Sequence, residues 1–393
     1  METALIKRLQ HLLGIIVLVT VITACNRPLI PEYAQHGGQH KKGSGKTAVP
    51  PLRPRLGVDL YSKLNYSSAR VRQWGERDIK YIAQDLHVTN ISISWNLFAP
   101  FNHSNQVMAV RRVTRTGGSK PGSVQLGSSL TPHNLSILTS IAKNYGATVE
   151  FRPLVKIEGP KQWSGYIAPY NVETWFHNYF LAELPYLRLA QQAHVREFII
   201  GTELTDLEKV ATKRGWGMFV RAVRSVYHGE ISYTAWEGHY YKAAKRALPP
   251  IRPYGLAAYP DFTFHAVHCP GNPSVAQLVS RWMKQFRSVP AWLRTQTTID
   301  ELGIPAGCGA WRAPWNWNRD YPPDQTAQAR WFTSACIAVA RLGLRGVYFW
   351  NVNLADNPYY PSRSLTSFEG KAGARAIRGC RKLLRTSRSS RGG

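Results

Sequence analysis

The sequence predicts an α/β fold, a (β/α)8 TIM barrel that forms a single catalytic domain. Short apolar runs rich in β-branched residues alternate with longer segments of helical periodicity, which is typical of parallel strands joined by helices. Eight such runs occur, the number that closes a barrel. The chain has 393 residues, 44% of them hydrophobic, which suits a large core, although length alone would also allow two average domains.

The expected strands are, in chain order, Leu56 to Tyr61, Val88 to Trp95, Thr148 to Ile157, Val195 to Gly201, Ile231 to Trp236, Tyr254 to Ala258, Gln296 to Ile299 and Gly346 to Trp350. Apolar side chains recur at helical spacing between them, as at Leu135, Leu138 and Ala142. Thr131 and Pro132, just before this stripe, are typical of an N-cap followed by proline at the first helical position.

The first 25 residues have the features of an export signal, with a positive start and an apolar run from Leu12 to Ile22. That run is shorter than the ~20 apolar residues that a membrane span needs. Ile22-Thr23-Ala24-Cys25 resembles the lipobox of bacterial lipoproteins, in which Cys25 becomes the lipidated N-terminus after cleavage. An uncleaved anchor or an ordinary signal is the alternative. We therefore expect an exported lipoprotein on the outer face of the bacterial cell membrane.

Three further segments complete the expected organisation. Residues 26–50, rich in glycine and lysine, are expected to form a flexible tether before a barrel domain that spans 51–370. The polar, glycine-rich stretch 102–128 predicts an unusually long loop that is disordered or builds a binding site. Residues 371–393 are expected to be a basic, solvated and partly helical tail.

The formal net charge of +27 is extreme, and residues 371–393 contribute eight Lys or Arg with no Asp or Glu. On an exported, monomeric protein, such a surface would be attracted to anionic lipid or to anionic wall polymers rather than to nucleic acid. Charge thus points to a cell-surface setting and away from a nucleic-acid partner.

Once Cys25 is set aside, an even number of cysteines is left in a chain bound for an oxidising compartment. We expect Cys269 to pair with Cys308, and Cys336 with Cys380. Four unpaired, buried cysteines are the alternative. No CxxC spacing occurs, which argues against zinc, and we expect neither a metal nor a cofactor.

Two glutamates stand where expected strands end. Glu203 follows the fourth strand in Gly201-Thr202-Glu203, and Glu301 ends the seventh in Ile299-Asp300-Glu301. In a TIM barrel the chemistry lies at the carboxyl ends of the strands. Glycoside hydrolysis needs two carboxyl groups, one to donate a proton and one to attack or stabilise the sugar carbon. Each glutamate alone could be an ordinary loop ion pair or a helix cap, but their joint placement predicts a catalytic pair.

This pattern resembles the retaining clan A glycoside hydrolases, and most closely glycoside hydrolase family 113, the β-mannanase group. The likeness covers residues of about 55 to 358, including Trp163-Ser164-Gly165-Tyr166-Ile167, Tyr233-Thr234-Ala235-Trp236 and Tyr254-Gly255-Leu256-Ala257-Ala258-Tyr259. The resemblance implies that Glu203 is the general acid/base and Glu301 the nucleophile. The third strand departs from the family's Lys-Pro-His-Val-Asp, because this chain has Arg152-Pro153-Leu154-Val155-Lys156.

Aromatic and polar side chains near strand ends are further candidates for substrate binding: Trp95, Trp163, Trp236, Tyr259, Trp350, Asn351, Arg152 and Asp59. Flat rings can stack on the apolar faces of sugars, although a single Trp could equally fill the core. Asp59 and Arg152 could instead form a structural ion pair. The run from Trp311 to Asn318 predicts either a binding platform or a rim packed on Cys269 and Cys308.

These residues favour a retaining glycoside hydrolase that cleaves β-glycosidic bonds in a mannan-like polysaccharide or a related cell-surface glycan. One alternative is an inactive glycan- or wall-binding lipoprotein on the same barrel, and another is an adhesive cationic surface protein. Phosphate-cradling glycine loops, HExxH and GxSxG motifs are absent from the sequence, which excludes the chemistries that depend on them.

Overall fold

The structure is a computed structural model that describes residues 54–114, 124–158, 163–242, 249–264, 269, 271–360 and 364–386. The expected signal peptide at 1–25, with Cys25, and the expected tether at 26–50 lie outside the described residues. Within the described ranges, no helix is both long and apolar enough to cross a membrane.

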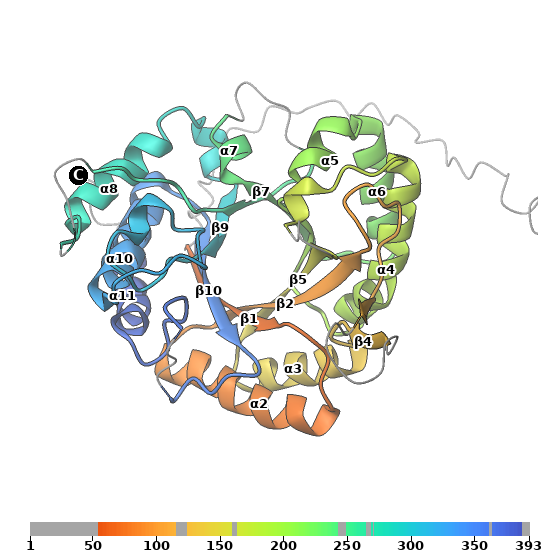
Figure 1. Ribbon diagram of the computed structural model, residues 1–393, viewed down its shortest axis with the longest axis horizontal. Helices are drawn as coiled ribbons and strands as arrows, with labels where there is room; N and C mark the ends of the chain where they lie inside the picture. Colours follow the sequence, from red (N-terminus) through yellow and green to blue (C-terminus); the bar gives the residue numbers. More distant parts are fainter. Residues whose placement is uncertain are drawn as a thin grey trace, which may run out of the picture. The chain divides into compact units, whose positions relative to one another are not determined.

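Eight parallel strands close into a barrel in the order β1-β10-β9-β8-β7-β6-β5-β2 (Figure 1). Their bounds are β1 Arg55–Ser62, β2 Asn90–Ala99, β5 Thr148–Ile157, β6 Glu197–Thr202, β7 Glu230–Trp236, β8 Tyr254–Ala257, β9 Thr297–Leu302 and β10 Gly346–Asn353. The predicted TIM barrel is confirmed. Because all strands are parallel, their carboxyl ends meet at one end of the barrel, where a site can be built from several loops.

Helices surround the barrel, as α2, α3, α4, α6, α10 and α11 show in Figure 1. The helices are α2 Ser68–Lys80, α3 Pro132–Asn144, α4 Val172–Gln192, α5 Thr205–Val210, α6 Lys213–Arg224, α7 Glu237–Tyr240, α8 Val275–Gln285, α9 Ala291–Arg294, α10 Gln325–Leu342 and α11 Ala372–Thr386. Thr131 caps α3 as expected, since its side chain accepts a hydrogen bond from the Asn134 N–H at 3.2 Å. The predicted stripe of Leu135, Leu138 and Ala142 is buried.

The amino-terminal end of the barrel is held by ion pairs between strands. Arg55 of β1 contacts Glu197 of β6 at 2.5 Å and Glu230 of β7 at 2.8 Å, and Arg345 contacts Glu230 at 2.5 Å. These charges satisfy one another at the first residues of the strands. The carboxylates at this end therefore serve the barrel's architecture, and the candidate catalytic glutamates lie at the other end.

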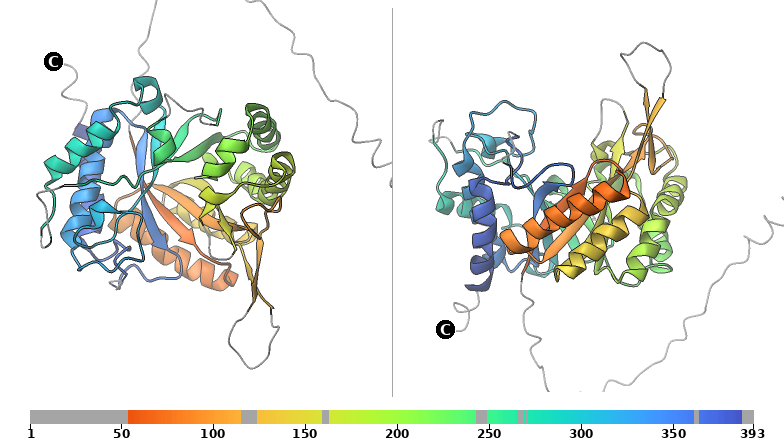
Figure 2. Two further views of the ribbon diagram at one scale, coloured as in Figure 1. Left: turned by 45° about the horizontal axis from the view of Figure 1, so that its top comes forward. Right: turned by 90° about the horizontal axis from the view of Figure 1, so that it is seen from below.

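Part of the expected loop 102–128 is a β-hairpin. Strands β3 (Val110–Thr114) and β4 (Val124–Ser128) pair antiparallel, with Val110 opposite Ser128. The hairpin projects away from the barrel (Figure 2). Valine, threonine and leucine in these two short segments favour strand pairing over an irregular loop. Residues 115–123, between the two strands, lie outside the described residues.

Residues 372–386 form α11, which agrees with the expected partial helix, but the expectation that this segment is solvated is wrong, because α11 packs against α10. Ile377, Cys380 and Leu384 lie on its buried face. This apolar stripe recurs at helical spacing between the arginines, so the arginines are carried on the remaining surface of an amphipathic helix. Residues 387–393 lie outside the described residues.

Both predicted disulfides are present. Cys336 of α10 pairs with Cys380 of α11 with a Cα–Cα distance of 5.6 Å, and Cys269 pairs with Cys308 with a Cα–Cα distance of 5.9 Å. Both distances are typical of protein disulfides. The Cys336–Cys380 disulfide fastens α11 to α10 of the barrel. The Cys269–Cys308 disulfide joins two loops on the barrel face that carries the candidate site.

Candidate active site

Glu203 follows β6 directly and has a left-handed backbone, with φ of 53°. Its N–H donates to the Thr234 carbonyl oxygen of β7 at 2.8 Å, and the next N–H, of Leu204, donates to the Tyr233 hydroxyl at 3.0 Å. A positive φ is unfavourable for a residue with a side chain, and it persists where neighbouring hydrogen bonds impose it. The neighbouring strand β7 thus fixes the position from which the Glu203 carboxyl projects.

The Glu203 side chain is partly buried, and its carboxyl accepts one strong hydrogen bond, from Trp163 Nε1 to Oε2 at 2.7 Å. Burial raises its pKa above the usual value. The Trp163 bond and the charges of Arg152 and Lys156 work in the opposite direction and are outweighed. A carboxyl with a raised pKa holds its proton over a wider pH range, as a general acid must.

Glu301 near the end of β9 has a different environment. The Tyr259 hydroxyl donates to its Oε1 at 2.6 Å, and the Arg152 guanidinium pairs with its Oε2. Two donors, one of them cationic, favour the ionised carboxylate and fix its orientation. Its side chain remains 15% exposed, so it reaches the barrel mouth. Arg152 and Tyr259 also interact electrostatically with Glu203, which brings the two glutamates into one neighbourhood.

Arg152 and Asp59 form an ion pair that is fully buried. Arg152 Nη1 lies 3.2 Å from both Asp59 oxygens and donates to the Asp300 carbonyl at 2.9 Å. Burial raises the pKa of Asp59 to about 6 despite the arginine. Of the two readings left open by the sequence, the structural pair is the one observed. Asp59 has no exposed surface for a sugar, and Arg152 acts as a positioning residue for Glu301.

Four of the five candidate aromatics gather at the carboxyl ends of the strands. Trp163 and Trp236 lie 6.0 Å apart between ring centroids, and the Trp350 ring lies 5.3 Å from the Arg152 guanidinium carbon. Tyr259 contacts Glu301 as described. Trp163, Trp236 and Trp350 are partly exposed, as is Asn351 after Trp350, so these side chains remain available to a sugar.

The prediction that Trp95 binds substrate is wrong, because its side chain has no exposed surface. Its ring packs against Tyr186 of α4 at 4.7 Å and against Phe151 at 5.6 Å. Side chains alternate along a strand, and in β2 the Ser94 hydroxyl turns inward to Asp59 at 3.1 Å. Trp95, one residue later, therefore turns outward and fills the layer between strands and helices.

Glu237 is a site residue that the sequence reasoning missed. It follows β7, and its Oε2 accepts the Tyr259 N–H at 2.7 Å, which fixes the backbone of a residue that contacts Glu301. Burial raises its pKa to about 8. A carboxylate directly after the strand-end Trp236 was the signal that could have identified it.

The tryptophan-rich run from Trp311 to Asn318 is buried at its start and approaches the candidate site near its end. Trp311 is buried, and its carbonyl accepts the Phe262 N–H at 3.0 Å. Trp317 stands edge-on to Tyr259 with centroids 5.5 Å apart. Trp315 is 49% exposed and is free to meet a ligand. The run therefore packs the rim at one end and lines the candidate site at the other.

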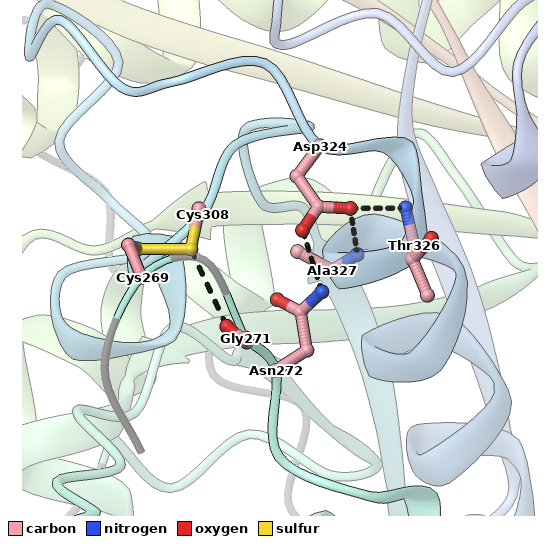
Figure 3. The surroundings of a disulfide bond; sticks show 7 residues. All are labelled: Cys269, Gly271, Asn272, Cys308, Asp324, Thr326 and Ala327. Carbon is pink, nitrogen blue, oxygen red and sulfur yellow. Dashed lines mark hydrogen bonds between the residues drawn. A yellow bond between two sulfur atoms is a disulfide. The ribbon is translucent and has the colours of Figure 1, made fainter.

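The Cys269–Cys308 disulfide ties the loop after β8 to the loop after β9 (Figure 3). In the same place, Asn272 Nδ2 donates to Asp324 Oδ2 at 2.6 Å. The other Asp324 oxygen caps α10 by accepting the Thr326 N–H at 2.8 Å. These bonds hold together the two loops that follow the strands leading to Tyr259 and Glu301.

A closed parallel barrel with paired glutamates at the carboxyl ends of two strands defines a barrel-type glycosidase architecture. The family model of Glycoside Hydrolase Family 113 matches residues 103–364, and the chain belongs to this family of glycoside hydrolases. The matched range includes the strand-end motifs in which the likeness was first seen.

Solved structures agree on the fold. A structure described as a GH113 β-1,4-mannanase is 15% identical, covers 84% of this chain and 99% of its own, and has a TM-score of 0.65. The GH113 β-mannanase AaManA from Alicyclobacillus acidocaldarius, solved in complex with ManMIm, is 15% identical over 84% of this chain and 97% of its own, with a TM-score of 0.62. No curated protein sequence matches the chain.

Proposed function

We propose that this glycoside hydrolase cleaves β-glycosidic bonds by double displacement and with retention of configuration, in a mannan-like polysaccharide or a related cell-surface glycan. Glu203 is proposed as the acid/base and Glu301 as the nucleophile. One observation carries the proposal: the two glutamates share a barrel mouth but have opposite surroundings. Burial favours a protonated Glu203, whereas Tyr259 and Arg152 donate to an ionised Glu301.

In the first step, the Glu301 carboxylate attacks the anomeric carbon while protonated Glu203 gives its proton to the departing glycosidic oxygen. A covalent glycosyl–Glu301 ester forms, and the leaving sugar departs as an alcohol. In the second step, ionised Glu203 takes a proton from water, and the resulting hydroxide displaces Glu301 from the anomeric carbon. Both glutamates return to their starting protonation states. No metal or cofactor takes part.

The surroundings support each role. The charges of Arg152 and Lys156 and the Trp163 N–H stabilise Glu203 once it has lost its proton, which is the state required of the base. The exposed parts of Trp236 and Trp350 offer flat apolar surface on which a sugar ring can stack. The names of the solved relatives, GH113 β-1,4-mannanases, support β-1,4-mannan as the first substrate to test.

The test is a panel of β-linked polysaccharides, β-1,4-mannan among them, and of aryl β-glycosides, assayed with the wild type, Glu203→Gln and Glu301→Gln. We expect both variants to lose at least about a hundredfold in kcat/KM on polysaccharide. On an aryl glycoside with an acidic leaving group, Glu203→Gln should lose far less in the glycosylation step, because that leaving group needs no proton.

Glu173→Gln, at an exposed position in α4, is the matched control, since it makes the same change away from the site. We expect it to match the wild type. Full activity of either Glu203→Gln or Glu301→Gln on polysaccharide contradicts the proposal. So does a wild type that binds these glycans and cleaves none of them.

We also propose that the enzyme is exported and anchored to the outer face of the cell membrane through lipid on Cys25. The support is the positive start, the short apolar run and the lipobox-like Ile22-Thr23-Ala24-Cys25. Expression with labelled fatty acid should place label on the wild type and none on Cys25→Ser. Equal labelling of both proteins would refute the anchor.

A further inference from the structure

Lys156 stands on the wall of the candidate site, near the end of β5. Strands β5 and β2 pair up to their last residues, with Lys156 opposite Phe98. Side chains alternate along a strand, so Lys156 lies on the same face as Arg152, whose guanidinium contacts Glu301. The ammonium of Lys156 also lies within the electrostatic reach of Glu203. A cation thus acts on the proposed acid/base from the strand face that also carries Arg152.

The two cations of this wall differ in their partners. The Arg152 guanidinium is engaged by the Asp59 carboxylate, the Glu301 carboxylate and the Asp300 carbonyl. Among the described residues, Lys156 makes no ion pair and no hydrogen bond through its side chain. Its side chain is mostly buried, and this burial lowers its pKa. Holding a buried ammonium without a counter-ion is unfavourable, which makes the site receptive to an anion.

The need for a counter-charge increases when the enzyme is ready to react. Glu203 must then be protonated, so it gives Lys156 no negative charge. Glu237, a carboxyl group that interacts electrostatically with Glu203, has a pKa of about 8 and is also protonated at neutral pH. Lys63, an exposed cation that acts on Lys156 electrostatically, adds further positive charge.

We propose that Lys156 binds an anionic group, a carboxylate or a sulfate, on a sugar next to the scissile bond, so that the substrate is an acidic β-linked glycan. This inference rests on the proposed function, because it assigns a substrate class to the same site. We place the anionic group next to the scissile bond because Glu203 protonates the glycosidic oxygen and Lys156 acts on Glu203 electrostatically. The net charge of +27 would also attract a polyanionic chain over a longer range.

The test measures binding, so that its result does not depend on turnover. Glu203→Gln serves as the background, since the neutral amide stands in for the protonated acid. Three ligands of equal length are titrated by calorimetry: β-1,4-linked mannotetraose, the β-1,4-linked tetramer of mannuronic acid, and 6-O-sulfated mannotetraose. The second and third differ from the first in the group at C6, and they distinguish carboxylate from sulfate.

We expect one acidic ligand to bind about tenfold to a hundredfold more tightly than the neutral one at low salt. This preference should shrink in about 0.5 M NaCl, because salt screens the attraction between the charges. Adding Lys156→Met should abolish the preference, and adding Lys156→Arg should retain it. Lys80→Met, which removes one exposed charge at the end of α2, is the matched control and should leave the preference unchanged.

The inference is overturned if the neutral tetramer binds as tightly as both acidic ones, if neither acidic ligand binds, or if Lys156→Met weakens all three equally. Thermal unfolding of each variant verifies that it is folded. Cleavage of neutral mannan without any acidic preference would remove this inference and leave the proposed function standing. Binding that depends on Lys156, with no cleavage of any glycan, would leave this inference standing and refute the proposed function.

Discussion

Removing Arg152 tests the electrostatic core of the candidate site. Arg152→Met keeps an apolar stem but leaves the buried Asp59 carboxyl without its cation, and it removes a donor from Glu301. Breaking one side of a buried ion pair costs about 3–5 kcal/mol of unfolding free energy. We expect Arg152→Met to lower the free energy of unfolding by about 3 kcal/mol at pH 8, the low end of that range. The reason is that Glu301 retains its bond from Tyr259 and some exposure to water.

The loss should depend on pH. Asp59 has a folded-state pKa of about 6, raised above its ordinary value, so its contribution to stability is present at low pH and lost as pH rises through that value. Without Arg152 the pKa rises further and the loss deepens. At pH 5, where Asp59 is largely protonated with or without arginine, Arg152→Met should cost clearly less than at pH 8.

Urea unfolding of a double-mutant cycle measures this effect. Asp59→Asn removes the stranded charge, so the double variant with Arg152→Met should lose less than the sum of the single losses, by about 1 kcal/mol or more. The reasoning is refuted if the two losses add, if Arg152→Met costs under about 1 kcal/mol, or if its cost is the same at pH 5 and pH 8.

Three further predictions concern single side chains. Trp163→Phe removes a hydrogen bond that stabilises ionised Glu203, so the alkaline limb of the kcat/KM profile should move to higher pH; an unmoved limb contradicts this role. Cys336→Ser should lower the unfolding free energy by about 2–4 kcal/mol in calorimetry or urea titration, and no loss would mean that the disulfide does not constrain the chain. Glu237 has a raised pKa of about 8, so its contribution to the stability of the wild type is lost as pH rises through that value. Between pH 6 and 9, the melting temperature of Glu237→Gln should therefore fall less than that of the wild type. Equal falls would contradict this reasoning.

The barrel and the two glutamates could be predicted because both depend on local signals. Each strand is a short apolar run, and a glutamate where such a run stops must lie at the carboxyl end of a parallel barrel. The two disulfides were predictable for a similar reason, since they join loops or helices that the barrel places side by side.

Trp95 was misplaced although the sequence held the necessary signal. Ser92 and Ser94 alternate with Ile91, Ile93 and Trp95, and the inward direction of the serines places Trp95 outside. A position close to a strand end brings a side chain to the site only when its phase along the strand turns it inward.

Other parts of the site depend on contacts between distant segments. The bond from the Tyr259 N–H to Glu237 and the edge-on approach of Trp317 to Tyr259 arise from how loops after different strands fold over one another. In α11, the arginines concealed an apolar stripe that becomes visible once the segment is read as a helix.

The most direct test of the central claim, a retaining mechanism carried by Glu203 and Glu301, is the anomeric form of the product at the moment of release. The wild type is mixed with its best β-linked substrate in deuterated buffer, and the anomeric proton signals are followed by NMR before mutarotation. The account predicts that the β-anomer appears first and that the α-anomer grows later. Initial release of the α-anomer would show inversion and contradict the account.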